Sequence, residues 1–190
     1  MAQPPMRSAT LALSLLTAPL ADSAGQTPLP PQAIFGDVVQ RFAAELHLSP
    51  LSAGVPLGIL ELRIWEGFGL TGVRLYQIHR EGGHWSARRF YPVDHPDRIE
   101  TEPLDESLPW AVRWSEAEAA GIWELTPSPA RPSDYVPRDD GWSVVVEAAE
   151  GPRYNISGSD NPDYACTADD QRLLTVVHAL LPTLTRYCQD

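Results

Sequence analysis

The feature that most constrains this chain is a hydrophobic period of two between about residues 58 and 92. The runs "ILELRIWEGFG", "GVRLYQIHRE" and "HWSARRFYP" tend to alternate apolar and polar side chains, as half-buried strands do. Gly82 and Gly83 separate the last two runs, and glycines supply the positive φ angles that a two-residue hairpin turn requires. Three strands joined by short turns therefore predict an antiparallel meander.

Three other segments have the period of an amphipathic helix. Residues 35–48 place Val38, Phe42 and Leu46 on one face, with Val39 and Ala43 beside them. Residues 107–121 and 167–181 predict two more helices.

The two later helices carry capping signals. Ser107 can cap the first of them, Pro109 suits its first turn and Gly121 can end it. Thr167 and Asp170 form a capping pair for the second. The buried stripe predicted for this last helix is Leu173, Val177, Leu180 and Leu184.

The remaining segments complete an α+β fold. "IWEL" (122–125) predicts a short strand, and "GWSVVVEAAE" with "RYNIS" predicts a hairpin that turns at Gly151-Pro152. Residues 93–106 and 126–140 are rich in proline and predict loops. We expect an antiparallel sheet of about five to six strands, a meander plus a hairpin, packed with two to three helices in a single domain over residues 34–190.

The N-terminus predicts export. An apolar run at residues 9–21 follows Arg7, is too short to span a bilayer, and precedes small residues at which a signal peptidase can cut, near Ala21 to Ala24. Residues 1–24 are therefore predicted to be a cleaved signal peptide and residues 25–33 an extended linker. No later segment has transmembrane length, so we expect a soluble periplasmic or secreted protein. Its net charge of −11 repels phosphate backbones and argues against nucleic-acid binding.

Cys166 and Cys188 are the two cysteines of the chain. A continuous helix between them would hold them ~30 Å apart, whereas a disulfide needs Cα atoms within ~7 Å. They can form a bridge within the chain if Pro182 breaks that helix. Otherwise one thiol is buried, or Cys188 pairs between two chains.

The segment "DGWSVVVEAAEGPRYNISGSDNPDY" (140–164) resembles a block in an uncharacterised family of small exported bacterial proteins. That block has Asp-Gly before a strand ending in glutamate, then a tyrosine strand, and Asn-Pro before the last helix. The matching residues are Asp140, Gly141, Glu147, Tyr154, Asn161 and Pro162. The resemblance covers about the last eighty residues and implies an exported fold without implying an activity.

The predicted hairpin around Gly82-Gly83 offers a candidate binding face. A two-residue turn places Glu81 opposite His84 and Arg80 opposite Trp85. One face then carries alternating arginines and aromatic rings, a surface suited to a sugar ring or an acidic group. The candidate ligand-binding residues are Arg74, Tyr76, Arg80, Trp85, Arg89 and Tyr91. The other interpretation is that Tyr76, Ile78 and Trp85 join the core while the arginines extend along its edge.

The positions of the tryptophans and histidines do not predict a second ligand-binding site or a metal site. Trp110, Trp114 and Trp142 lie on apolar faces and are expected in the core, while Trp65, Trp85 and Trp123 are undetermined. The spacing of His79, His84 and His95 matches no zinc pattern, and "SGSDNPDY" lacks the features of an EF-hand loop. We therefore predict no metal site and no cofactor.

The usual enzyme signatures are missing from the sequence. There is no Gly-x-Ser-x-Gly, no His-Glu-x-x-His and no phosphate loop. Acid–base chemistry would need a pocket in which Glu147 meets His79 or Asp140.

Three functions stay open. The first is a non-catalytic binding or accessory domain of the bacterial cell envelope, with an envelope protein or a cell-wall glycan as its partner. The second is a small exported hydrolase with an unconventional carboxylate or histidine site. The third is a structural subunit that forms homodimers.

Overall fold

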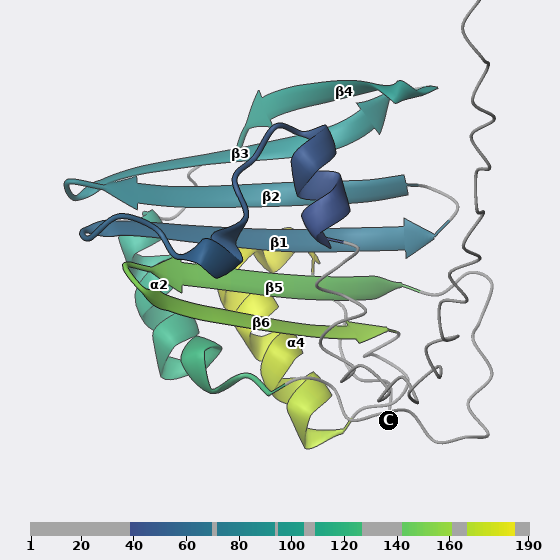
Figure 1. Cartoon of the computed structure of the whole chain (residues 1–190). Helices are drawn as coiled ribbons and strands as arrows, with labels where there is room; N and C mark the ends of the chain where they lie inside the picture. Colours follow the sequence, from purple (N-terminus) through teal and green to yellow (C-terminus); the bar gives the residue numbers. More distant parts are fainter. Residues whose placement is uncertain are drawn as a thin grey trace, which may run out of the picture.

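The computed structural model describes residues 39–69, 72–93, 95–104, 109–126, 142–160 and 167–184. The strands are β1 (Ile59–Gly69), β2 (Gly72–Glu81), β3 (His84–Val93), β4 (His95–Pro103), β5 (Ser143–Glu150) and β6 (Arg153–Asp160). They form one antiparallel six-stranded sheet in the order β4-β3-β2-β1-β5-β6 (Figure 1). The predicted α+β class, meander and hairpin are confirmed. The predicted signal peptide, linker and both cysteines lie outside the described residues.

The predicted register of the first hairpin is confirmed. Glu81 faces His84 and Arg80 faces Trp85 across β2 and β3. Gly82 and Gly83 have φ angles of 56° and 83°, the left-handed values that a two-residue turn of this hand requires. The second hairpin turns at Gly151-Pro152 as predicted, and β5 joins the meander by pairing with β1.

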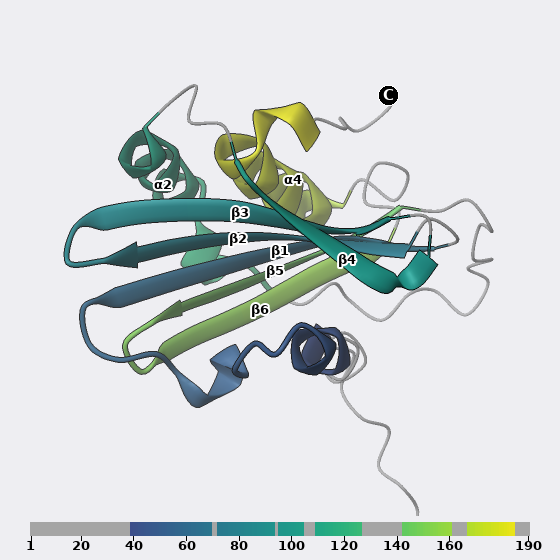
Figure 2. The ribbon, with the colours of Figure 1, turned by 90° about the horizontal axis from the view of Figure 1, so that it is seen from above.

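The back face of the sheet carries the larger core. It is covered by α2 (Trp110–Ala119) and α4 (Ala168–Leu180), which lie side by side behind the strands (Figures 1 and 2). Leu60, Leu62 and Ile64 of β1 alternate onto this face and are fully buried. Trp110, Trp114 and Trp142 are buried in the same core, as predicted, and Trp65 is buried on the opposite face.

The front face carries a smaller core under a short helix. Residues 39–45 form this N-terminal helix, which lies across the front of the sheet (Figure 2). Val39 and Ala43 of the helix pack on Trp65, Leu75 and Phe90. A short 3-10 helix, η1 (Leu51–Ala53), lies beside it on the same face. The rest of the front face has no helix over it among the described residues.

Two predictions of secondary structure are wrong. Residues 95–103 form the edge strand β4 rather than a loop. The outer side of an edge strand has no ladder to complete, so the prolines of this segment are tolerated there. Residues 122–124 form the 3-10 helix η2 (Ile122–Glu124) rather than a strand. Trp123 in that turn packs edge-on against Trp114 at a centroid distance of 6.0 Å, which ties the segment to α2.

The helix ends agree with the sequence in most details. Thr167 and Asp170 form the predicted capping box at the start of α4. Gly121 follows the C-cap of α2 with a φ angle of 87°. Pro109 occupies the N-cap position rather than the first turn, and Ser107 lies outside the described residues. Leu184 falls in the 3-10 helix η3 (Pro182–Leu184), beyond the end of α4, and is half-buried. Among the described helices, none combines the length and hydropathy needed to cross a membrane.

Candidate functional site: a buried polar network beside an open groove

The front face of the sheet is organised in cross-strand rows of side chains. The row beneath the N-terminal helix is apolar: Phe90, Leu75, Trp65 and Val145 face one another across β3, β2, β1 and β5. The next row toward the hairpin turns is charged or polar, and consists of Arg88, Gln77, Arg63 and Glu147 on the same strands. The row after it contains Ser86, His79 and Glu61. The sheet register thus brings polar residues from four strands together.

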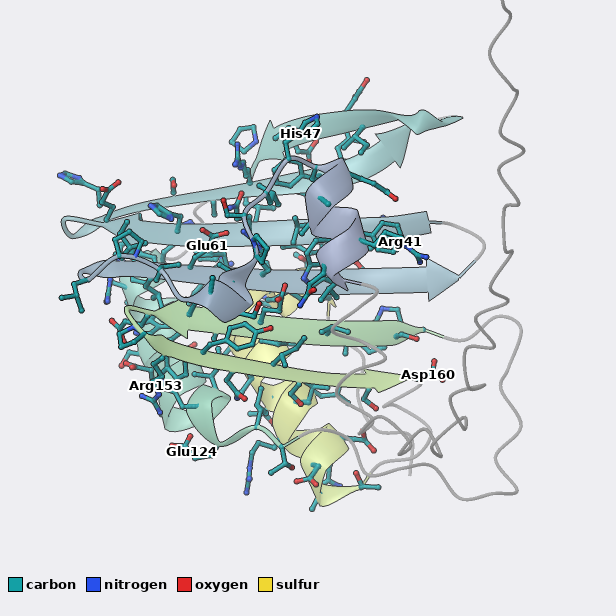
Figure 3. All side chains as sticks on the ribbon, viewed as in Figure 1. Arg41, His47, Glu61, Glu124, Arg153 and Asp160 are labelled. Carbon is teal, nitrogen blue, oxygen red and sulfur yellow. The ribbon has the colours of Figure 1, made fainter. Side chains whose placement is uncertain are left out.

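Glu61 is the centre of this network. Figure 3 shows its side chain on the front of the sheet, between β1 and β2. Its Oε1 accepts hydrogen bonds from Arg63 Nε at 2.8 Å and Gln77 Nε2 at 2.7 Å. Its Oε2 lies 3.9 Å from His79 Nδ1. Arg63 is only 2% exposed, so the ion pair with Glu61 compensates a buried charge.

Glu147 ends the network on β5, where it is only 3% exposed. Its carboxylate accepts hydrogen bonds from Trp65 Nε1 at 2.7 Å and Tyr154 Oη at 3.0 Å. Burial raises the pKa of Glu147 above its ordinary value, while the hydrogen bond from Trp65 and the charge of Arg63 act in the opposite direction. Burial and the neighbouring carboxylate also raise the pKa of Tyr154, so its hydroxyl stays a donor.

An open groove of about 510 Å³ lies at the other end of the network. It is lined by Glu61, Gln77, His79, Ser86, Ala87 and Arg88. Its volume is within the range of ~300–1,000 Å³ typical of small-ligand sites. Hydrogen bonds to more buried side chains hold the donors at its surface in place. Arg88 Nε donates to Gln77 Oε1 at 2.8 Å, and Gln77 Nε2 donates to Glu61. The groove can therefore present a set of polar groups in one arrangement.

A second cavity on the front face is apolar. It has a volume of about 150 Å³ and is lined mainly by side chains such as Phe42, Leu46, Val73 and Phe90, with Glu45 as its acidic residue. It continues the smaller core under the N-terminal helix. The polar groove is the better candidate site, because it combines several hydrogen-bonding side chains with an open surface.

The arginine–aromatic residues predicted as a ligand-binding set lie on the back face. Tyr76 is 4% exposed and belongs to the core with Ile78, and Trp85 packs against that core. Burial, with the neighbouring Glu66, raises the pKa of Tyr76 to about 12, and its hydroxyl donates to Glu66 at 2.9 Å. Tyr91 lies beside Glu100 and Glu102.

The arginines of that set are paired with carboxylates. Arg74 lies 3.6 Å from Glu66, Arg80 lies 2.5 Å from Glu150, and Arg89 forms an ion pair with Glu102. Arg80 also lies over the Trp85 ring and Arg89 over the Tyr91 ring. This geometry matches the interpretation in which arginines extend along the edge of the core.

The acid–base residues are not brought together in the part of the chain that the structure describes. His79 lies 3.9 Å from Glu61 and 3.8 Å from Glu81, while Glu147 binds Trp65 and Tyr154. No hydrogen bond joins His79 to Glu147, and Asp140 lies outside the described residues. No group of three or more potential metal ligands occurs within the described ranges.

Several residues of the network had no assigned role at the level of sequence, among them Glu61, Arg63, Trp65, Gln77 and Arg88. The signal was present in "ILELRIWE", where charged residues alternate with the apolar residues of one strand. Such alternation usually marks a solvated strand face. Only the positions of β5 and β6 show that part of this face is buried.

No family model matches this chain, and no match to it was found among curated proteins or solved structures.

Proposed function

We propose that the chain is an exported, non-catalytic binding domain of the bacterial cell envelope whose ligand occupies the polar groove of the front face. The observation that carries the binding part is the buried network beside the groove. Arg63 and Glu147 are ionisable side chains that are almost fully buried in the sheet. Replacing such buried charges by apolar residues of similar shape is often neutral or stabilising. Stability alone therefore does not explain the network. We infer that it positions the polar groups at the surface of the groove.

The shape of the groove favours a small polar ligand over a flat protein partner. Its lining offers a carboxylate, an amide, an imidazole, a hydroxyl and a guanidinium within one open cavity. Sugars and short peptides carry many hydrogen-bonding groups and are bound by convergent polar side chains of this kind. A fragment of a cell-wall glycan or its attached peptide is therefore the ligand class we favour.

Export rests on the predicted signal peptide and on the resemblance of residues 140–164 to small exported proteins. Expression of the full chain in a bacterial host, followed by mass spectrometry of the periplasmic fraction, tests it. Cleavage near Ala21 to Ala24 would support the proposal. An intact N-terminus confined to the cytoplasm would contradict it.

A thermal-shift scan of the mature chain tests the binding role. The probes are soluble peptidoglycan fragments, acidic oligosaccharides, divalent metals and a chelator. A ligand that binds only the folded state adds ~2.7 kcal/mol at one hundred times its dissociation constant, so the Tm must rise with the logarithm of the ligand concentration above that constant.

Two variants locate the site. Ser86→Tyr fills the groove from an exposed position and should abolish the shift. Thr175→Tyr places the same side chain on an exposed position of α4 and should leave the shift unchanged. A concentration-dependent shift that survives Ser86→Tyr would place the ligand elsewhere, and a flat response to every probe would remove glycan binding from the proposal.

A further inference from the structure

We propose that the groove recognises a carboxylate group of its ligand and that Arg88 binds this group through its two terminal nitrogens. The inference rests on the proposed function, because it assigns a ligand class to the same groove. It is carried by three observations: the ion-pairing state of Arg88, the way its side chain is held, and the groups beside it.

Arg88 differs from the other arginines of the meander. Arg63, Arg74, Arg80 and Arg89 each lie close enough to a carboxylate to form an ion pair. Arg88 has no such carboxylate anywhere in the described residues. Arg88 therefore presents a guanidinium charge that no carboxylate of the described residues neutralises.

The Arg88 side chain is nevertheless held in place. Its Nε donates to Gln77 Oε1 at 2.8 Å, and its guanidinium carbon lies 4.8 Å from the centre of the Phe90 ring. These contacts use one N–H and one face of the guanidinium plane. The two terminal nitrogens remain for a ligand, and their parallel N–H groups match the two oxygens of a carboxylate.

Gln77 acts as a positioning residue between Arg88 and the buried ion pair. It is only 7% exposed, and its Nε2 donates to Glu61 Oε1 at 2.7 Å. Its amide can donate to a carboxylate on one side and accept from a guanidinium on the other in only one orientation. Since Arg63 fixes Glu61, the direction of Arg88 is set by a chain of three buried or half-buried side chains.

The neighbours of Arg88 in the groove complete the site. Ser86 is exposed beside it on β3, and His79 lies directly opposite Ser86 on β2. Both side chains offer hydrogen bonds to an oxygen-rich group. The carboxylate of the groove, Glu61, is compensated by its ion pair with Arg63, which lowers the repulsion that a ligand carboxylate would meet.

The test compares matched acids and neutral derivatives on the full mature chain. N-acetyl-dialanine is compared with its C-terminal amide, and digalacturonic acid is compared with its methyl ester. Binding is measured by calorimetry and located from the backbone amide resonances of Ser86 and Arg88. The two pairs distinguish a peptide terminus from an acidic sugar as the source of the carboxylate.

Three variants accompany the ligands. Arg88→Gln removes the positive charge and the paired terminal N–H donors of the guanidinium from an exposed side chain. Gln77→Leu keeps Arg88 but removes its hydrogen bond, and the Arg88 Nε proton resonance reports whether the guanidinium is released. Arg153→Gln is the control, because Arg153 also lacks an acidic partner in the described chain but lies on β6, outside the groove.

At least one acid should bind saturably, and its neutral derivative should bind at least tenfold more weakly. Arg88→Gln should lose at least tenfold in affinity and Arg153→Gln less than twofold. Gln77→Leu should weaken binding and shift the Arg88 Nε proton resonance together. Melting temperatures close to that of the unmutated chain establish that each variant is folded.

The contrary results separate the two proposals. Equal affinity for an acid and its neutral derivative, or full affinity in Arg88→Gln, would overturn carboxylate recognition while groove binding stands. The absence of any change in the groove resonances with all four probes would overturn carboxylate recognition, and with it the assignment of this groove as the ligand site.

Discussion

The two faces of the sheet treat charge in different ways. On the back face, α2 and α4 cover an apolar core, and the arginines of the strands lie at its margin with substantial exposure, 47% for Arg74 and 35% for Arg89. On the front face, Arg63 and Glu147 lie in the middle of the sheet at 2% and 3% exposure. The same strands therefore carry partly exposed ion pairs along the margin of one face and a buried network on the other.

This difference predicts different energetic roles. Exposed ion pairs contribute ~0–1 kcal/mol, because water screens them and their long side chains lose entropy. A buried network depends on every partner, because removal of one leaves another charged group without compensation. Single substitutions in the back-face pairs should therefore change the free energy of unfolding only slightly. A single substitution in the front-face network should destabilise the fold strongly.

Arg63→Met gives the largest expected effect. It removes the guanidinium that compensates Glu61 and lies opposite Glu147, and we expect a loss of ~3–5 kcal/mol in the free energy of unfolding. Urea denaturation measures it. The double variant Arg63→Met/Glu61→Leu also removes the carboxylate that Arg63 compensates and should recover part of the loss. A cost below ~1 kcal/mol for Arg63→Met would mean that the front-face network behaves like an exposed pair.

Leu62→Ala tests the back-face core on the same strand. Leu62 is fully buried between the sheet and the helices, and its truncation should cost about 3 kcal/mol through lost burial and a cavity. Leu57→Ala is the control, because Leu57 is 88% exposed and should change stability by less than ~0.5 kcal/mol. A cost for Leu62→Ala larger than that of Arg63→Met would reverse the order expected for the two faces.

The sequence predicted the back face more completely than the front. The alternation through Leu60, Leu62 and Ile64 and the paired glycines of the turn are local signals, and they determined the meander and its register. The edge strand β4 was missed because its prolines resemble loop residues, and its partner strand is what makes it a strand. The local sequence pattern does not show which strand will pair with this segment.

The network on the front face was missed for a related reason. Glu61 and Arg63 look like residues of a solvated strand face, but they lie opposite Ala149 and Glu147 of β5, more than eighty positions away in the chain. The local pattern does identify both charged residues and their shared face. It cannot identify the strand that will lie beside them.

A third prediction concerns pH and the carboxylate of Glu147. Burial raises its pKa in the folded state, so between the ordinary glutamate pKa and the raised value the folded state binds more protons than the unfolded state. The contribution of Glu147 to stability therefore falls as pH rises through that window. The stability of the unmutated chain relative to Glu147→Gln should decrease as the pH rises above the ordinary glutamate pKa, as measured by urea denaturation at a series of pH values.

Tyr154→Phe is the matched variant for this pH dependence. It removes one donor to the charged carboxylate and should steepen the decline. A relative stability that increases with pH would instead mean that Trp65, Tyr154 and Arg63 together outweigh burial at Glu147.

The smallest effect is expected for Arg74→Gln at the margin of the back face. Arg74 is 47% exposed and lies 3.6 Å from Glu66, so its loss should change the free energy of unfolding by less than ~0.5 kcal/mol. Glu66 keeps the hydrogen bond from the Tyr76 hydroxyl to its Oε2, so its carboxylate retains a donor when Arg74 is removed. Urea denaturation at low and high salt measures this change in the free energy of unfolding. Salt screens the ion pair, so the change should be smaller at high salt. A salt-insensitive cost above ~1.5 kcal/mol would show that Arg74 and Glu66 act as a buried pair. The charged groups of the two faces would then contribute similarly to the free energy of unfolding, despite their different positions in the sheet.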